Sequence, residues 1–78
     1  MTYKNQQTKF PFLTLPLLIS LSENYGKEHV INERFGQYVM NRTSFKQDEY
    51  DNVNIFYEEN FFLVFNALTK YCIDTCNL

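Results

Sequence analysis

Residue types that small proteins use for chemistry or for cross-linking are scarce in this 78-residue sequence. It contains two cysteines, one histidine, two glycines and two prolines, and no tryptophan. Two cysteines cannot cross-link a small domain into a disulfide scaffold, and two glycines leave little room for a loop that wraps a phosphate group. The low glycine and proline content also excludes collagenous and low-complexity chains.

Net charge is small as well. Seven Lys and Arg against nine Asp and Glu give a formal net charge of −2, which argues against a strongly basic nucleic-acid-binding protein. The charges are unevenly placed, since residues 1–46 carry six bases and three acids, whereas residues 47–78 carry one base and six acids. The simplest interpretation is that the halves pack together and partly neutralise each other. An acidic face that repels or imitates nucleic acid is the alternative.

Apolar side chains, in contrast, are plentiful. Hydrophobic residues make up 45% of the chain, with eight Phe and six Tyr, which excludes disorder and predicts one domain, residues 1–78, around one small core. The apolar stretch 10–21 contains two prolines and is shorter than the ~20 residues needed to span a bilayer, so no membrane contact is expected. Two lysines precede it, and a secretory signal is an alternative; we interpret it as the lead-in and start of the first helix.

Helical spacing predicts an all-α fold, a small bundle of three main helices plus a short helical turn. The first helix, over about 15–25, follows the N-cap residue Thr14, has Pro16 in its first turn and ends at Gly26. The other predicted elements are a helix over 33–42, a helical turn from a capping box at 44–47 through residue 50, and a helix over 57–73.

The last predicted helix is apolar on more than one face. A strand is the rival interpretation for residues 61–65, because Phe and Val favour sheets, but the residues that follow keep the helical period. One core cannot receive five consecutive large apolar side chains, so we expect Phe62 and Leu63 to face a dimer seam or a partner surface. The inward stripe is predicted to be Phe61, Val64, Phe65, Leu68 and Cys72.

Residues that could carry catalysis or bind a metal are few. His29 is the only histidine and lies in a predicted linker, without a nucleophile in local register. Cys72 and Cys76 are four residues apart, and two thiolates with one distant histidine do not make a zinc site. Apart from a metal shared across a dimer interface, this inventory predicts a protein that is not an enzyme and that uses no metal or other cofactor.

Two short motifs stand in a definite order. Residues 33–37 read Glu-Arg-Phe-Gly-Gln, with Asn41 four residues later, and residues 54–60 read Asn-Ile-Phe-Tyr-Glu-Glu-Asn. This order resembles a family of small, mostly uncharacterised proteins of bacteriophages and bacterial mobile elements, which read Arg-(aromatic or Leu)-Gly-Gln, then Asn, then Asp-x-Phe-Tyr and three acids. Asn54 and Asn60 depart from that pattern. The resemblance implies a small accessory protein that works in the host cytoplasm.

The motif residues are expected to be mainly structural. Arg34 would form an ion pair with Glu58 or Glu59 and so join the basic half of the chain to the acidic half. An exposed binding face made by Arg34, Gln37 and Asn41 is the alternative. The predicted structural set is Arg34, Gly36, Gln37, Asn41, Phe56 and Tyr57, with the last two packing beside Gly36.

Taken with the phage-like motifs, the surplus apolar surface predicts a protein that binds and occludes a host protein, such as a defence nuclease or a polymerase. Apolar side chains would anchor the contact and acidic ones would supply charge complementarity. No direct binding of nucleic acid is expected, and a homodimer is an alternative, as are a self-assembling structural component and a secreted or membrane-associated peptide. The predicted contact residues are Phe62, Leu63, Tyr71, Glu58, Glu59, Asp48 and Glu49, with Phe10 and Phe12 as further exposed aromatics.

Overall fold

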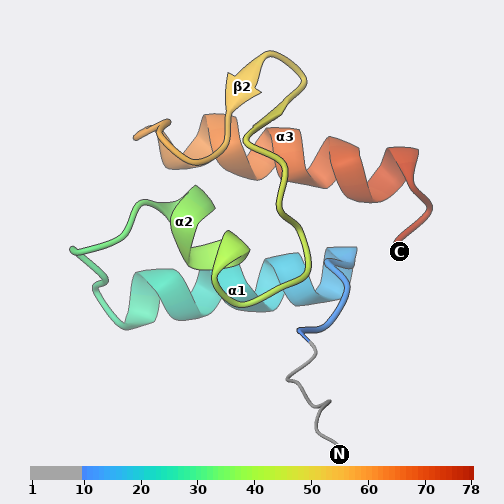
Figure 1. Ribbon diagram of the computed structural model, residues 1–78. Coiled ribbons are helices and arrows are strands. Elements are labelled where there is room, and N and C mark those ends of the chain that lie inside the picture. Colours follow the sequence, from blue (N-terminus) through green and yellow to red (C-terminus); the bar gives the residue numbers. More distant parts are fainter. Residues whose placement is uncertain (1–9) are drawn as a thin grey trace, which may run out of the picture.

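The computed structural model describes residues 10–78, which form three helices and a two-stranded antiparallel sheet (Figure 1). The prediction of an all-α bundle is therefore wrong, because the fold is mixed. The elements are α1 (Leu15–Lys27), α2 (Phe35–Met40), β1 (Glu49–Tyr50), β2 (Val53–Asn54) and α3 (Phe61–Asp74).

A β-hairpin replaces the helical turn that was predicted through residue 50. The chain reverses through Asp51 and Asn52, whose φ angles are 53° and 64°. A turn with positive φ at both central residues has the twist that matches two antiparallel strands. Asp and Asn adopt positive φ more readily than most residues. The segment before it is neither helix nor strand, and Phe45 in it is buried with its ring 4.8 Å from that of Tyr71. The paired residues are Glu49 with Asn54 and Tyr50 with Val53.

Helix α1 begins where the sequence predicts and ends two residues later than predicted. The N–H of Leu17 bonds to the Thr14 hydroxyl at 3.4 Å, and a proline occupies the first turn. Gly26 lies inside the helix, and the left-handed residue beyond its end is His29, with φ 51°. The interpretation of residues 10–21 as the lead-in and start of a core helix is confirmed.

The other two helices are shorter than predicted. Helix α2 covers six residues, and α3 begins four residues later than expected because the Asn60 side chain accepts hydrogen bonds from the N–H groups of Phe62 and Leu63. Residues 61–65 are helical, so the strand alternative is wrong. Among the helices of residues 10–78, none combines the length and apolar character needed to cross a membrane.

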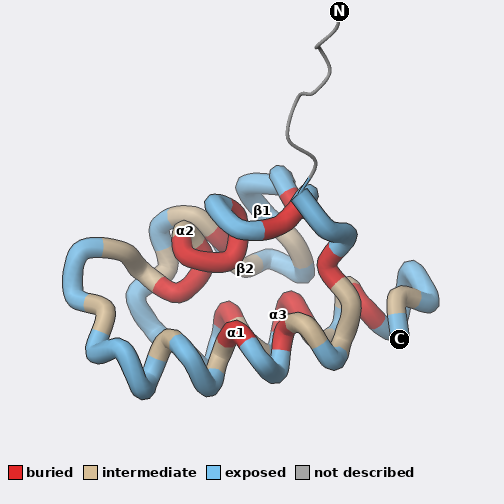
Figure 2. The backbone as a smooth tube through the Cα atoms, turned by 90° about the horizontal axis from the view of Figure 1, so that it is seen from below, coloured by how far each residue is buried: buried red, intermediate tan, exposed pale blue. Residues whose placement is uncertain are grey.

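The elements form two layers with the core between them. Helices α1 and α3 lie side by side in one layer, and α2 and the hairpin form the other (Figures 1 and 2). The two long helices are antiparallel, since the N–H of Leu15 bonds to the carbonyl of Asn77 and the ring of Tyr25 stacks on Phe61. The buried apolar core consists of Leu13, Leu18, Leu21, Phe35, Tyr38, Val39, Met40, Phe45, Ile55, Val64, Ala67, Leu68 and Cys72.

Candidate functional site

The two sequence motifs meet where the start of α2 touches the connection between β2 and α3. At Gly36, a Cβ atom would lie 1.7 Å from the carbonyl oxygen of Ile55, so only glycine permits this approach. The three atoms nearest to such a Cβ belong to Ile55, two in its carbonyl group and one in its side chain, so the closest neighbour of Gly36 is Ile55 rather than the ring of Phe56 or Tyr57. Phe56 is half-buried against the core, and Tyr57 is 64% exposed.

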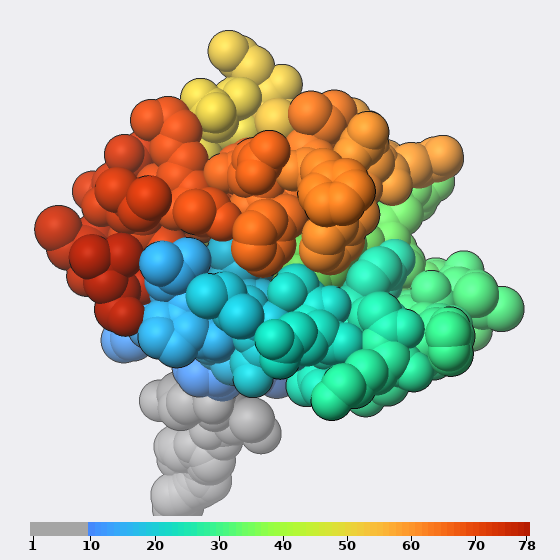
Figure 3. All heavy atoms as spheres, turned by 180° about the vertical axis from the view of Figure 1, so that it is seen from behind, coloured from blue at the N-terminus to red at the C-terminus, as the bar shows by residue number. Residues whose placement is uncertain are grey.

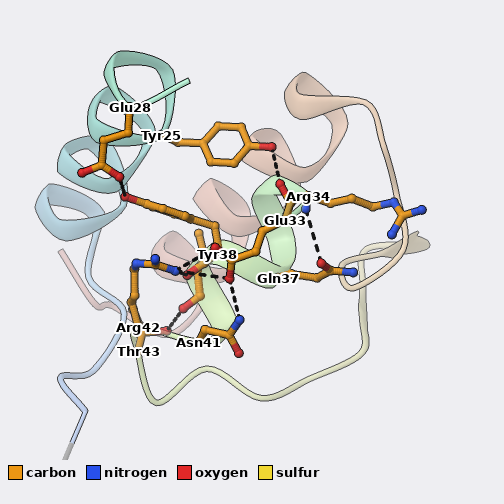
Figure 4. Close-up of polar contacts among 10 residues, drawn as sticks. Tyr25, Glu28, Glu33, Arg34, Gln37, Tyr38, Asn41, Arg42 and Thr43 are labelled. Carbon is orange, nitrogen blue, oxygen red and sulfur yellow. Dashed lines mark hydrogen bonds and ion pairs between the residues drawn. The ribbon is translucent and has the colours of Figure 1, made fainter. Parts of the chain in front are cut away.

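The polar side chains of the first motif are engaged inside the chain (Figure 4). Gln37 donates from Nε2 to the carbonyl of Phe56 at 3.2 Å and accepts the N–H of Arg34 at 3.4 Å. Asn41 donates to the Glu33 carboxylate at 2.6 Å. Arg34 and Asn41 stand at opposite ends of α2, as its N-cap and its C-cap. Arg34, Gln37 and Asn41, which were the alternative binding face, each have their own intramolecular partner.

Arg34 joins the two motifs through a weak contact. Its Nη2 lies 3.4 Å from Oε2 of Glu59, with the two side chains 39% and 81% exposed. The contact is single rather than a two-pronged fork, and Nε of Arg34 is buried without a hydrogen-bond partner among the described residues. Within residues 10–78 this is the one ion pair that links the basic half to the acidic half; the others are Arg42–Glu33 and Lys70–Asp74.

Replacement of Arg34 by alanine is expected to cost less than about 1 kcal/mol of unfolding free energy, because exposed ion pairs contribute little. Urea unfolding of the wild type, R34A, E59A and the double variant measures the coupling between the two side chains, which we expect to be below about 0.5 kcal/mol. A loss of several kcal/mol in R34A alone would show that Arg34 is essential to the fold.

Beside this junction lies an open hollow of about 410 Å³. Two of its lining residues, Arg34 and Glu59, form an ion pair with each other. A third, Glu33, bonds through its carboxylate to Asn41 and Arg42, which do not line the hollow. Ile31, 89% exposed, adds an apolar edge to it. The lining residues are Tyr25, Val30, Ile31, Asn32, Glu33, Arg34 and Glu59.

Helix α3 presents two different surfaces outside the core. Phe62 and Ile73 are eleven residues apart and lie on its outer face, 71% and 55% exposed. Leu63, 47% exposed, lies on the same side of α3 as Asp74, which is eleven residues further along and accepts a hydrogen bond from Tyr50 of β1. Figure 3 shows the outer side of α3 beside α1. The exposure expected for Phe62 and Leu63 is thus observed.

The start of α3 and the residues before it carry four exposed side chains and the half-buried Glu58. We call this region the 57–63 corner: Tyr57, Glu58, Glu59, Phe62 and Leu63. Asp48 and Glu49 are exposed on the neighbouring hairpin. Tyr71, predicted to be an exposed anchor, is instead half-buried, with its ring 4.8 Å from that of Phe45 and 5.4 Å from that of Tyr50.

Two exposed apolar residues at this end were not predicted as contact residues. Ile31 follows Val30 in a predicted linker, where no periodicity marks its exposure, and Tyr57 is a predicted packing residue. Phe10 and Phe12, 49% and 77% exposed, lie in the lead-in to α1.

The hairpin is fastened to α3 by Tyr50. Its hydroxyl donates to Asp74 at 2.6 Å, and this hydrogen bond raises the pKa of Tyr50 to about 12 and lowers that of Asp74. Lys70 lies 3.4 Å from the same carboxylate. Since Tyr50 holds its proton more tightly in the folded chain, its contribution to stability is complete below pH 10 and is lost as the pH rises towards 12.

Thermal unfolding of the wild type and Y50F measures this contribution. We expect the wild type to be the more stable at neutral pH, and the difference in Tm to shrink between pH 10 and pH 12. A difference that stays constant over that range would mean that the hydrogen bond to Asp74 does not hold the proton.

The two cysteines are free thiols in different surroundings. Cys72 is buried, and burial raises its pKa, whereas Cys76 is exposed. Within residues 10–78, no group of three or more His, Cys, Asp and Glu side chains is placed to hold a metal ion.

Comparison with known protein families, with curated proteins and with solved structures gives no match for this chain. The resemblance of residues 33–60 to small phage and mobile-element proteins stays a prediction. The surfaces and contacts of the chain itself are what a functional argument can use.

Proposed function

We propose that this chain is a small phage-type accessory protein that binds a host protein with the 57–63 corner and occludes that protein's working surface. The exposure of Phe62 and Leu63 carries the proposal. Phe62 is 71% exposed, with its ring edge-on to that of Phe61 at 5.3 Å, and Leu63 is 47% exposed. Large apolar side chains that remain this exposed in their own chain are typical anchors of protein interfaces.

The core does not need these two side chains. The buried stripe of α3 is complete with Val64, Ala67, Leu68 and Cys72, and the Asn60 cap fixes the start of the helix. Phe62 and Leu63 therefore stand on a rigid first turn, which limits the entropy lost when a partner orders them.

Because the anchors lie outside the core, docking can be tested without unfolding the chain. Immobilised wild-type protein, a double variant F62A/L63A and a control variant I31A are each incubated with lysate of a bacterial host. We expect the wild type and I31A to retain the same host protein, and F62A/L63A to lose it. Equal retention by all three proteins would contradict docking at the 57–63 corner.

A homodimer or a larger self-assembled structure is the alternative that the same apolar surface allows. Light scattering on purified protein separates the two. A monomer supports the host-protein proposal, and a stable oligomer that F62A/L63A dissociates supports self-assembly.

A further inference from the structure

We propose that the surface recognised by the 57–63 corner is basic and amphipathic, a partner segment in which Lys or Arg residues flank one or two large apolar side chains. This inference rests on the proposed docking function and adds the chemistry of the partner. It follows from the charges that surround the two apolar anchors.

The surroundings of the anchors are acidic over a long stretch of chain. Residues 47–69 contain no Lys or Arg and five acids. The hairpin brings the acids together, because the carbonyl of Asp48 accepts the N–H of Ile55 at 2.7 Å and Glu49 pairs with Asn54. Asp48 and Glu49 thus lie opposite the start of the connection that carries Glu58 and Glu59, and Asp51 lies in the turn of the hairpin. The five are Asp48, Glu49, Asp51, Glu58 and Glu59.

Little positive charge within the chain offsets this group. Among the described residues, Glu59 is the one member with an ion pair, its single 3.4 Å contact with Arg34. Glu58, which is half-buried, accepts the N–H of Asn60 at 3.0 Å and has no ion pair within residues 10–78. The remaining carboxylate oxygens stay available to donors from outside, and Lys and Arg are the side chains that bind them best.

Two of these carboxylates stand next to the apolar anchors along the chain. Glu58 and Glu59 lie in the connection that leads into α3, four and three residues before Phe62 in its first turn. An apolar centre with a charged rim is the usual composition of a specific protein interface. The apolar centre supplies affinity, and the rim selects a partner of opposite charge and speeds its approach.

The same charges argue against other occupants of this corner. A second copy of the chain would set the same carboxylates against one another, and an acidic partner would be repelled in the same way. A basic amphipathic segment is the occupant whose charge is complementary to the rim while its apolar side chains cover Phe62 and Leu63.

Fluorescence anisotropy with synthetic peptides tests this inference on the full chain. Three amphipathic helical peptides share one leucine stripe and carry lysine, glutamine or glutamate at every polar position. We expect the lysine peptide to bind about 10-fold more tightly than the glutamine peptide, and the glutamate peptide to bind more weakly than either. Binding of the lysine peptide should weaken as salt is added.

Variants of the chain separate the role of charge from that of the apolar anchors. E58Q/E59Q should weaken the lysine peptide by about 3- to 10-fold and reduce its salt dependence, while E23Q, an exposed acid on α1, should have no effect. F62A/L63A should weaken the lysine and glutamine peptides about 10-fold or more, and I31A should not.

The outcomes distinguish the inference from the function on which it rests. If the lysine and glutamine peptides bind equally and both depend on Phe62 and Leu63, the proposed docking at the 57–63 corner is supported, and the inference that the partner is basic is wrong. If the lysine peptide binds but ignores F62A/L63A, the contact is unspecific attraction, and both proposals are wrong. Self-association of the chain would appear as a mass that rises with protein concentration. If this association reduces peptide binding, the inference is also overturned.

Discussion

Replacement of Gly36 by alanine is expected to destabilise the chain by about 3 kcal/mol or more. The new Cβ would lie 1.7 Å from the carbonyl oxygen and 2.7 Å from the carbonyl carbon of Ile55. Both are backbone atoms, so no rotation of a side chain relieves the overlap. A domain of this length is stable by only about 4–12 kcal/mol, so G36A should unfold at much lower urea concentration.

Gly26 provides a matched control for this substitution. It lies inside α1, and no atom would come within 4 Å of a Cβ placed there. The same change, G26A, should therefore stabilise the chain by about 0.5–1 kcal/mol, since alanine is the better helix former. Urea unfolding followed by circular dichroism measures both variants. A G36A protein as stable as G26A would show that α2 and the connection to α3 do not pack as closely as described.

The sequence indicates that something approaches Gly36 but not what it is. A glycine inside a predicted helix is costly, which implies a close neighbour. Both a ring and a backbone segment satisfy that condition. The choice depends on the path of residues 54–57, and that path is set by the hairpin, which the sequence analysis missed.

Local chemistry predicted the long helices well and the hairpin badly. Thr14 and Pro16 correctly placed the start of α1, and helical periodicity correctly favoured helix over strand in α3. Strands of two residues are too short to show an alternating pattern, and an Asp-Asn pair can end a helical turn as readily as it can form the turn of a hairpin. The capping box at residues 44–47 starts no helix, and Phe45 is buried against Tyr71 in a segment that is neither helix nor strand.

The part of the candidate site that depends on local pattern could be predicted, and the part that depends on tertiary contacts could not. Exposure of Phe62 and Leu63 follows from counting the faces of one helix, which needs no tertiary information. Tyr71 was misassigned because its neighbours are Phe45 and Tyr50, which reach it from distant parts of the chain. Side chains such as Ile31, in a linker without periodicity, give no pattern from which exposure could be predicted.

Replacement of Phe35 by alanine is expected to cost about 3–5 kcal/mol. Phe35 is 2% exposed, and its ring lies 5.3 Å from Tyr25 of α1, 4.6 Å from Phe61 and 6.5 Å from Phe65 of α3. It therefore connects α2 to both long helices, and removing the ring leaves a cavity that three elements cannot close without moving. Thermal unfolding should show a fall in Tm of more than 10 °C, given about 4–8 °C per kcal/mol in domains of this size.

Phe62→Ala makes the same chemical change at a position 71% exposed and should alter stability by no more than about 0.5 kcal/mol. The contrast bears on function as well as on folding. If F62A unfolds like F35A, Phe62 belongs to the core, and any loss of binding in that variant reports only unfolding. If F62A keeps the stability of the wild type and loses the partner, the 57–63 corner is a docking surface, because the fold is intact and one exposed ring has been removed. A stable F62A that retains full binding would place the working surface elsewhere on the protein.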